Sequence, residues 1–214
     1  MTHSPHRTAH DFVWLASQSP RRAQLLAQIG IRHRLLLADR HEDAEALEAE
    51  IAGELPADYV RRVTLAKLAA AVRRHARRGL PPAPILAADT TVALGRRILG
   101  KPRDAADAAA TLAALAGRTH RVLTAVALHS EPDDGSPAGI EVNVSHVRLA
   151  PMSAAEIAAY VASGEPFGKA GAYAIQGRIA GWIEYLEGSY TGIMGLPLYE
   201  TARLLANAGV RFSA

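Results

Sequence analysis

Leu15-Ala16-Ser17-Gln18-Ser19-Pro20-Arg21-Arg22 joins a short apolar run, residues 12–16, to a segment of helical character that extends to Gly30. Ser19 is of a residue type favoured at helix N-caps, and proline suits the first helical position because its missing N–H has no partner there. Gly30 suits a helix C-terminus. The stretch therefore predicts a strand, a tight turn and a helix that begins at residue 20.

Arg21 and Arg22 fall in the first turn of that helix, where the helix dipole disfavours cations. A bound anion would remove this cost, because free backbone N–H groups, the hydroxyls of Ser17 and Ser19 and two guanidinium groups together suit a phosphate. The alternative is a capped surface helix with two solvated arginines. The stretch alone leaves both interpretations open.

The composition is that of an ordinary globular protein. The chain has 214 residues, of which 49% are hydrophobic and 21% charged, and it contains no cysteine, so disulfides and thiolate zinc sites are excluded. No apolar run approaches the length of a membrane span, and residues 1–11 lack a signal-peptide core. We therefore expect a cytoplasmic protein with a flexible extension at residues 1–11 and one domain of two lobes at 12–214. A formal net charge of +3 is too small to indicate nucleic acid.

Lysine is unexpectedly rare. Lys and Arg together number 24, yet only Lys67, Lys101 and Lys169 are lysines, and the other 21 cations are arginine. These three positions could mark sites that need a compact ammonium group, or they could reflect codon bias. Lys67 also shares the apolar face of a long predicted helix, residues 57–78, at helical spacing from Val60 and Val63.

Further along the chain, an acidic, helix-prone segment at residues 39–54 contains Glu42, which we interpret mostly as a solvated surface. Residues 85–88 are typical of a buried strand that ends at Asp89, and open α/β sheets place catalytic or metal-binding carboxylates at strand ends. The alternative is a turn aspartate. Residues 119–128 and 141–149 alternate as half-buried strands do. A glycine-rich loop, residues 164–177, contains Lys169 and Gln176 and could approach a ligand closely.

Six short motifs occur in order along the chain and together resemble the Maf family of nucleoside triphosphate pyrophosphatases. They are Ala16-Ser17-Gln18-Ser19-Pro20-Arg21-Arg22, Ala88-Asp89-Thr90, Lys101-Pro102-Arg103-Asp104, Lys169-Ala170-Gly171-Ala172-Tyr173, Ile175-Gln176-Gly177 and Gly195-Leu196-Pro197-Leu198. The resemblance covers residues 13–206. It implies an α/β fold: an elongated, twisted mixed β-sheet flanked by helices, in two lobes with a central cleft, as in inosine triphosphate pyrophosphatases.

The resemblance also assigns roles to residues. Asp89, Lys67 and Lys101 match catalytic positions, and Asp89 and Glu42 match acids that could hold a divalent cation, Mg²⁺ or Mn²⁺; Asp89 could instead accept a proton. The substrate-binding positions are Ser17, Ser19, Arg21, Arg22, Thr90, Lys169 and Gln176. Among them, Arg21, Thr90 and Gln176 match the subgroup that resembles dTTP/UTP pyrophosphatases.

The resemblance therefore implies a nucleoside triphosphate diphosphatase that hydrolyses dTTP and UTP to the monophosphate and pyrophosphate, with modified pyrimidine triphosphates as further candidate substrates. The resemblance implies a homodimer, with no membrane and no specific nucleic acid as partner. Two alternatives remain open: a non-catalytic nucleotide or nucleic-acid binder that uses the arginines, and a cell-division regulator.

Overall fold

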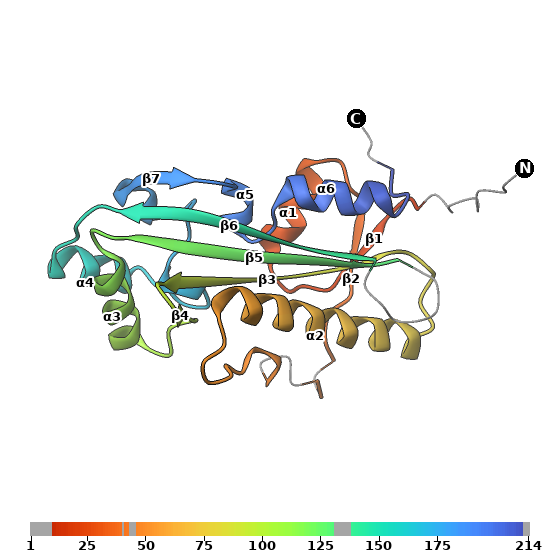
Figure 1. Cartoon of the computed structure of the whole chain (residues 1–214), viewed down its shortest axis with the longest axis horizontal. Helices are drawn as coiled ribbons and strands as arrows, with labels where there is room; N and C mark the ends of the chain where they lie inside the picture. Colours follow the sequence, from red (N-terminus) through yellow and green to blue (C-terminus); the bar gives the residue numbers. More distant parts are fainter. Residues whose placement is uncertain (1–9, 40, 43–45, 131–137, 212–214) are drawn as a thin grey trace, which may run out of the picture.

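The computed structural model describes residues 10–39, 41–42, 46–130 and 138–211 and is built on a seven-stranded mixed sheet (Figure 1). The strands are β1 (Val13–Leu15), β2 (His33–Leu35), β3 (Ile85–Leu94), β4 (Arg97–Leu99), β5 (Thr119–His129), β6 (Gly139–Leu149) and β7 (Ile183–Glu187). Their order is β2-β1-β3-β5-β6-β7, and β4 pairs with β3. The β1 pairings are parallel and the others antiparallel, so the α/β mixed sheet is confirmed.

Helices cover both faces of this sheet. They are α1 (Pro20–Gln28), α2 (Pro56–Arg77), α3 (Ala105–Leu115), α4 (Ala154–Ala162), α5 (Tyr190–Met194) and α6 (Leu198–Asn207), with short 3₁₀ turns η1 (Ala46–Glu48), η2 (Ala170–Ala172) and η3 (Arg178–Trp182). The long helix α2 runs along one face, while α1 and α6 lie on the other (Figure 1). Helices α3 and α4 gather at the far end of the sheet, where β4 and β7 lie (Figure 1).

Separate apolar clusters hold these layers together. On one face, Leu25 and Leu26 of α1 and Leu205 of α6 pack against β1, β3 and β5. On the other, Leu68 and Ala71 of α2 pack against the same three strands. A third cluster, around Leu112 of α3, fills the far end. Strands β3 and β5 extend from the clusters beside β1 to the cluster around Leu112. The middle of β3 therefore lies between these clusters.

Two local expectations were wrong. Asp89 does not end its strand: β3 continues to Leu94, because Thr90, Thr91 and Val92 keep their ladder with β5. The acidic segment at 39–54 was expected to be helical, but within its described residues only η1 is. Its carboxylates are instead bound by side chains of α2, as Glu42 is by Arg74 and Glu54 by Arg62.

Most of the expected extension, residues 1–11, lies outside the described residues. Of the two described positions, His10 forms a bridge with Val210, and the Asp11 carbonyl accepts a hydrogen bond from Arg32. Within the described part of the chain, no helix combines the length and apolarity needed to cross a bilayer.

Candidate active site

A cavity of about 440 Å³ opens where the β1–α1 turn, the middle of β3 and α2 face one another. Nine of the residues singled out from the sequence line it: Ser17, Ser19, Arg21, Arg22, Lys67, Asp89, Thr90, Lys101 and Lys169. They come from segments far apart in the chain, so the fold brings together side chains that are widely separated in the sequence.

At one end of the cavity, neutral oxygens hold the guanidinium group of Arg22. Its Nε donates to the Gly195 carbonyl at 2.7 Å, its Nη1 to Ser17 Oγ at 3.1 Å, and its Nη2 to Thr90 Oγ1 at 3.4 Å. The neighbouring Arg21 Nε donates to the Met194 carbonyl at 3.3 Å. None of these acceptors carries a charge, so the bonds orient the arginines and leave their positive charge for a ligand.

Lys169 adds a third cation near this end. Its Nζ donates to the carbonyl oxygens of Glu165 and Phe167, at 2.5 and 3.3 Å. Burial lowers the pKa of Lys169, and the charge of Arg21 lowers it further. Burial is also the main reason why the pKa of Arg22 lies below its usual value, although the Asp89 carboxylate opposes that shift. An anion bound here would relieve the repulsion among the three cations.

The β1–α1 turn places the hydroxyls and arginines as its sequence requires, with one difference. Ser19 occupies the N-cap position of α1, but its side chain forms no capping bond. The Ser19 backbone N–H instead donates to Ser17 Oγ at 3.1 Å. Ser17 therefore fixes both the turn and Arg22, which explains a hydroxyl at this position.

Carboxylates and lysines pair at the other end of the cavity. Lys67 Nζ donates to Asp89 Oδ1 at 2.6 Å and to Glu48 Oε1 at 2.7 Å, and Lys101 Nζ donates to Glu48 Oε2 at 2.8 Å. Burial would raise the pKa of Glu48, but the hydrogen bonds from Lys101 and Lys67 hold it below its usual value. Both carboxylates bind the same ammonium group, so Asp89 and Glu48 lie close together in the cavity lining.

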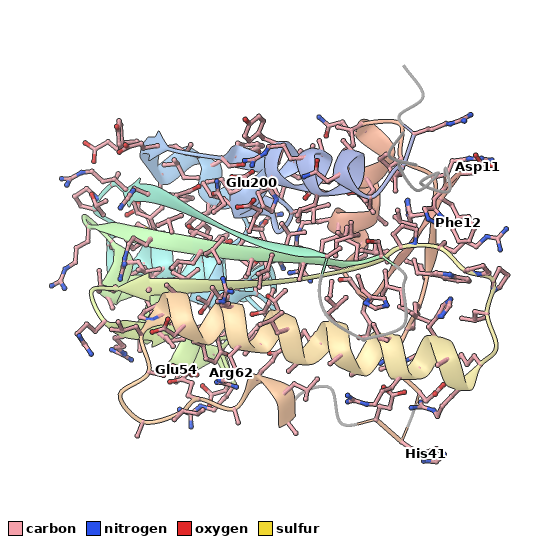
Figure 2. The ribbon with its side chains drawn as sticks, turned by 45° about the vertical axis from the view of Figure 1, so that its right-hand side comes forward. Asp11, Phe12, His41, Glu54, Arg62 and Glu200 are labelled. Atoms are coloured by element: carbon pink, nitrogen blue, oxygen red, sulfur yellow. The ribbon has the colours of Figure 1, made fainter. Side chains whose placement is uncertain are left out.

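Glu48 is held in place by contacts between the η1 segment and α2. Tyr59 Oη donates to the Glu48 carbonyl at 2.9 Å. Arg62 donates to both carboxylate oxygens of Glu54 at 2.7 Å and to the Ala49 carbonyl at 2.8 Å. Glu54 and Arg62 lie side by side next to α2 (Figure 2). These contacts tie Glu48 and the residues that follow it to the helix that carries Lys67.

The structure does not bring Glu42 and Gln176 into the cavity lining. Glu42 accepts hydrogen bonds from Arg74 at 2.5 and 3.1 Å and from Arg77 at 2.8 Å. The Arg74 bond is the main reason why the pKa of Glu42 falls to about 2. The side chain of Gln176 is exposed in the glycine-rich loop.

Sequence reasoning missed Glu48. It lies in the acidic segment at 39–54, where its residue type does not distinguish it from its neighbours. The short η1 turn and the hydrogen bond from Tyr59 to the Glu48 carbonyl help to place the Glu48 side chain beside Lys67. No local signal in the sequence could have selected it.

Tyr173 and His120 form a buried pair next to the cavity. Tyr173 lines the cavity, and its hydroxyl lies 2.8 Å from His120 Nε2. Burial lowers the pKa of His120 to about 4, so this imidazole is neutral at pH 7. The pair therefore contributes packing and a neutral hydrogen bond rather than charge.

The carboxylate end of the cavity fits a divalent cation that is shared with a ligand. Within the described residues, no group of three or more His, Asp or Glu side chains could hold a metal ion by protein ligands alone. Mg²⁺, however, usually takes one or two carboxylates and completes its shell with water and substrate phosphates. Asp89 and Glu48 supply such a pair.

Comparison with known proteins gives one consistent result. The model of the family described as Maf-like protein matches residues 12–208. A protein of Ralstonia nicotianae named dTTP/UTP pyrophosphatase is 59% identical over 206 residues, which is 96% of this chain and 98% of that protein. Proteins of the same name from Cupriavidus pinatubonensis and Cupriavidus metallidurans are each 60% identical, over 95% and 94% of this chain and 100% and 98% of their own lengths.

Proposed function

This chain belongs to the Maf family, and on that premise we propose that it hydrolyses dTTP and UTP to the nucleoside monophosphate and pyrophosphate. The observation that carries the proposal is the division of the cavity. Arginines bound only to neutral oxygens lie at one end, and a cluster of two carboxylates and two lysines lies at the other. Such a cavity offers an anion site next to a group that can act on water.

The arginine end is suited to the phosphates. Arg21, Arg22 and Lys169 present three cations, and the N-terminus of α1 adds its dipole and backbone N–H groups. In phosphoryl transfer, the leaving pyrophosphate develops negative charge that fixed donors of this kind stabilise. The three side chains therefore bind the substrate and also favour departure of the product.

The carboxylate end is suited to the attacking water. We propose that Asp89 and Glu48 hold Mg²⁺ or Mn²⁺, with Lys67 and Lys101 positioning the two carboxylates. A bound cation of this kind would neutralise phosphate charge and lower the pKa of water. Asp89, which is 7% exposed, could also accept the proton of the water. Glu42, the second acid implied by the resemblance, is already engaged by Arg74 and Arg77, and this supports Glu48 in its place.

Base selection is proposed for Gln176 and its loop. A glutamine amide offers one donor and one acceptor, which match N3–H and O4 of uracil or thymine. Because Gln176 is exposed and lies outside the cavity lining, this contact requires the Gln176 side chain to turn toward the cavity when substrate binds. We expect Gln176→Glu to lower kcat/KM for dTTP and UTP more than for CTP and GTP. An equal decrease for all four would exclude base recognition by Gln176.

A panel of nucleoside triphosphates, assayed with Mg²⁺ and with Mn²⁺, tests the main proposal. We expect one pyrophosphate and one monophosphate per dTTP or UTP consumed. Release of orthophosphate alone, or no turnover of any pyrimidine triphosphate, would contradict it. A homodimer in the cytoplasm, implied by the family resemblance, is proposed as well, and sedimentation equilibrium measures the oligomeric state directly.

A further inference from the structure

Thr124 lies behind the arginine end of the cavity and does not line it. It is 1% exposed, on β5, directly opposite Thr90 of β3 in the ladder. Its Oγ1 donates to the Gly192 carbonyl of α5 at 2.7 Å and lies 2.9 Å from Thr90 Oγ1. One buried hydroxyl therefore contacts both the strand that carries Asp89 and the helix that holds the arginines.

The direction of these hydrogen bonds follows from counting hydrogens. A threonine hydroxyl has one hydrogen, and that of Thr124 goes to the Gly192 carbonyl, which can only accept. Thr90 must therefore donate to Thr124, and its remaining lone pairs face Arg22 Nη2. The Thr90 hydroxyl has no hydrogen left for a substrate phosphate, so it can only accept from the cavity side.

The contacts close into a ring. From Thr124 the ring passes to the Gly192 carbonyl, along the last turn of α5 to the Gly195 carbonyl, and from there to Arg22 Nε. From Arg22 it returns through Thr90 to Thr124. Two of the three hydrogen bonds that the Arg22 guanidinium group donates belong to this ring, and the third goes to Ser17 Oγ.

We propose that Thr124 is a positioning residue for Arg22: its buried hydroxyl sets the orientation in which the guanidinium group meets the phosphates. Loss of the hydroxyl releases Thr90 and also the Gly192 carbonyl, which accepts a hydrogen bond from the backbone N–H of Gly195, the residue whose own carbonyl Arg22 Nε uses. The inference rests on the proposed binding of phosphate by Arg22. It makes Thr90 a support for Arg22, whereas the subgroup resemblance alone would assign Thr90 to direct substrate choice.

The test uses inorganic pyrophosphate as the probe, because its binding can be measured by calorimetry without turnover. Thr124→Val keeps the shape of the side chain and removes the hydroxyl, and we expect it to weaken pyrophosphate binding about tenfold. Thr124→Ser restores the hydroxyl and is expected to bind within about twofold of wild type. With dTTP, we expect Thr124→Val to raise KM by the larger factor and to lower kcat by a smaller one, because Arg22 also stabilises the leaving pyrophosphate.

A double-mutant cycle separates positioning from general loss of structure. In an Arg22→Lys background, Thr124→Val has no guanidinium group to orient, so we expect no further weakening of pyrophosphate binding. Thr64→Val is the matched control, because Thr64 is also fully buried and donates to a backbone carbonyl, that of Val60, at 2.8 Å. It is expected to lower Tm about as much as Thr124→Val and to bind pyrophosphate as wild type does.

Several results would overturn the inference. They are unchanged pyrophosphate binding in Thr124→Val, an equal loss in the wild-type and Arg22→Lys backgrounds, and no pyrophosphate binding by the wild-type protein. If Thr124→Val does not fold, Thr90→Val breaks the same ring at the adjacent hydroxyl and must give the same loss of about tenfold. If pyrophosphate binds as expected and dTTP is not hydrolysed, the proposed function fails while the role of Thr124 stands.

Discussion

At the arginine end of the cavity the cations are held by neutral oxygens, and at the lysine end they are held by carboxylates. Arg22 bonds to a carbonyl and two hydroxyls, and Arg21 bonds to a carbonyl. Lys67 and Lys101 instead donate to Asp89 and Glu48. Both ends fix their side chains, but only the arginine end keeps its charge uncompensated.

This difference indicates that the two ends of the cavity have different functions. Uncompensated guanidinium groups attract an anion and bind it through several donors. Paired ammonium and carboxylate groups have little net charge, so they add little to anion affinity. Their ammonium groups hold the two carboxylates close together, which suits proton transfer or a cation. Substitutions at the arginine end should therefore change binding more than turnover, and substitutions at the lysine end should change turnover more than binding.

The largest effect is expected for Asp89→Asn. The amide can still accept the hydrogen bond from Lys67, so the fold should persist, but it cannot take a proton and is a poor metal ligand. We expect kcat for dTTP to fall by a factor that corresponds to a barrier increase on the order of 3–5 kcal/mol. Pyrophosphate binding, measured by calorimetry, should change little. A variant with more than about a tenth of the wild-type kcat would place Asp89 outside the chemical step.

Lys67→Arg should have the next largest effect, although it keeps the charge. The Lys67 side chain is 19% exposed and must reach two carboxylates, and a planar guanidinium group cannot occupy the same space. We expect kcat to fall about 50-fold, because the two carboxylates are pushed apart.

Lys101→Arg is the matched comparison, because the Lys101 side chain is 48% exposed and, among the described residues, pairs only with Glu48. Its kcat is expected to fall only about fivefold. Steady-state kinetics on both variants check the order. Equal losses would mean that burial of the ammonium group is irrelevant, and wild-type kinetics in both would make the rarity of lysine an accident of composition.

Comparison of Glu48 with Glu42 tests which of the two carboxylates holds the cation together with Asp89. Glu48→Gln removes a carboxylate next to Asp89, whereas Glu42→Gln removes one that Arg74 and Arg77 already engage. We expect Glu48→Gln to raise the Mg²⁺ concentration for half-maximal activity about tenfold, and Glu42→Gln to raise it less than about twofold. Titration of activity with Mg²⁺ decides between them. The reverse order would restore the assignment of Glu42 to the cation.

Much of this arrangement was predictable from the sequence because its signals are local. Ser19, Pro20 and the flanking apolar residues specify the β1–α1 unit, and the structure places Pro20 at the start of α1. The capping signal at the start of α4 is likewise a short-range pattern, and Ser153 and Glu156 form the full capping box. Nine of the residues selected by motif and composition line one cavity.

The rest depended on contacts that no local pattern encodes. Asp89 was expected at a strand end, but β3 continues because β5 lies beside it over its whole length. Glu48 enters the cavity only through tertiary bonds from Tyr59, Lys67 and Lys101. The bond from Thr124 to α5 spans 68 positions in the chain. Long-range packing of this kind leaves no periodic trace in the sequence.

The smallest and most selective effect is expected for substitution of Glu42, and it is an effect on the stability of the folded state. Hydrogen bonds from Arg74 are the main cause that holds its pKa at about 2, well below the usual value of 4.5. A carboxylate whose pKa is lowered by folding stabilises the folded state above its unfolded pKa, and the contribution disappears as pH falls through its folded pKa. The stabilisation by Glu42 is therefore present near neutral pH and is lost between pH 4.5 and about pH 2.

We expect Glu42→Gln to lower the free energy of unfolding by about 1–2 kcal/mol above pH 5, since Arg74, which is 5% exposed, then has the Leu36 carbonyl and a neutral amide oxygen as acceptors in place of a carboxylate. The difference between wild type and variant should shrink as pH falls below 4.5, because the Glu42 carboxyl of the unfolded chain then takes up a proton, which the folded carboxylate takes up only near pH 2. Urea unfolding of both proteins at neutral pH and near pH 3 measures this change.

Asp39→Asn is the control: Asp39 pairs with Arg77 and Arg78 on the exposed side of the same segment, and screening by solvent should make its effect smaller at every pH. If the difference in free energy of unfolding between wild type and Glu42→Gln stays constant down to about pH 2, the hydrogen-bond geometry of the amide, and not the loss of charge, destabilises the variant.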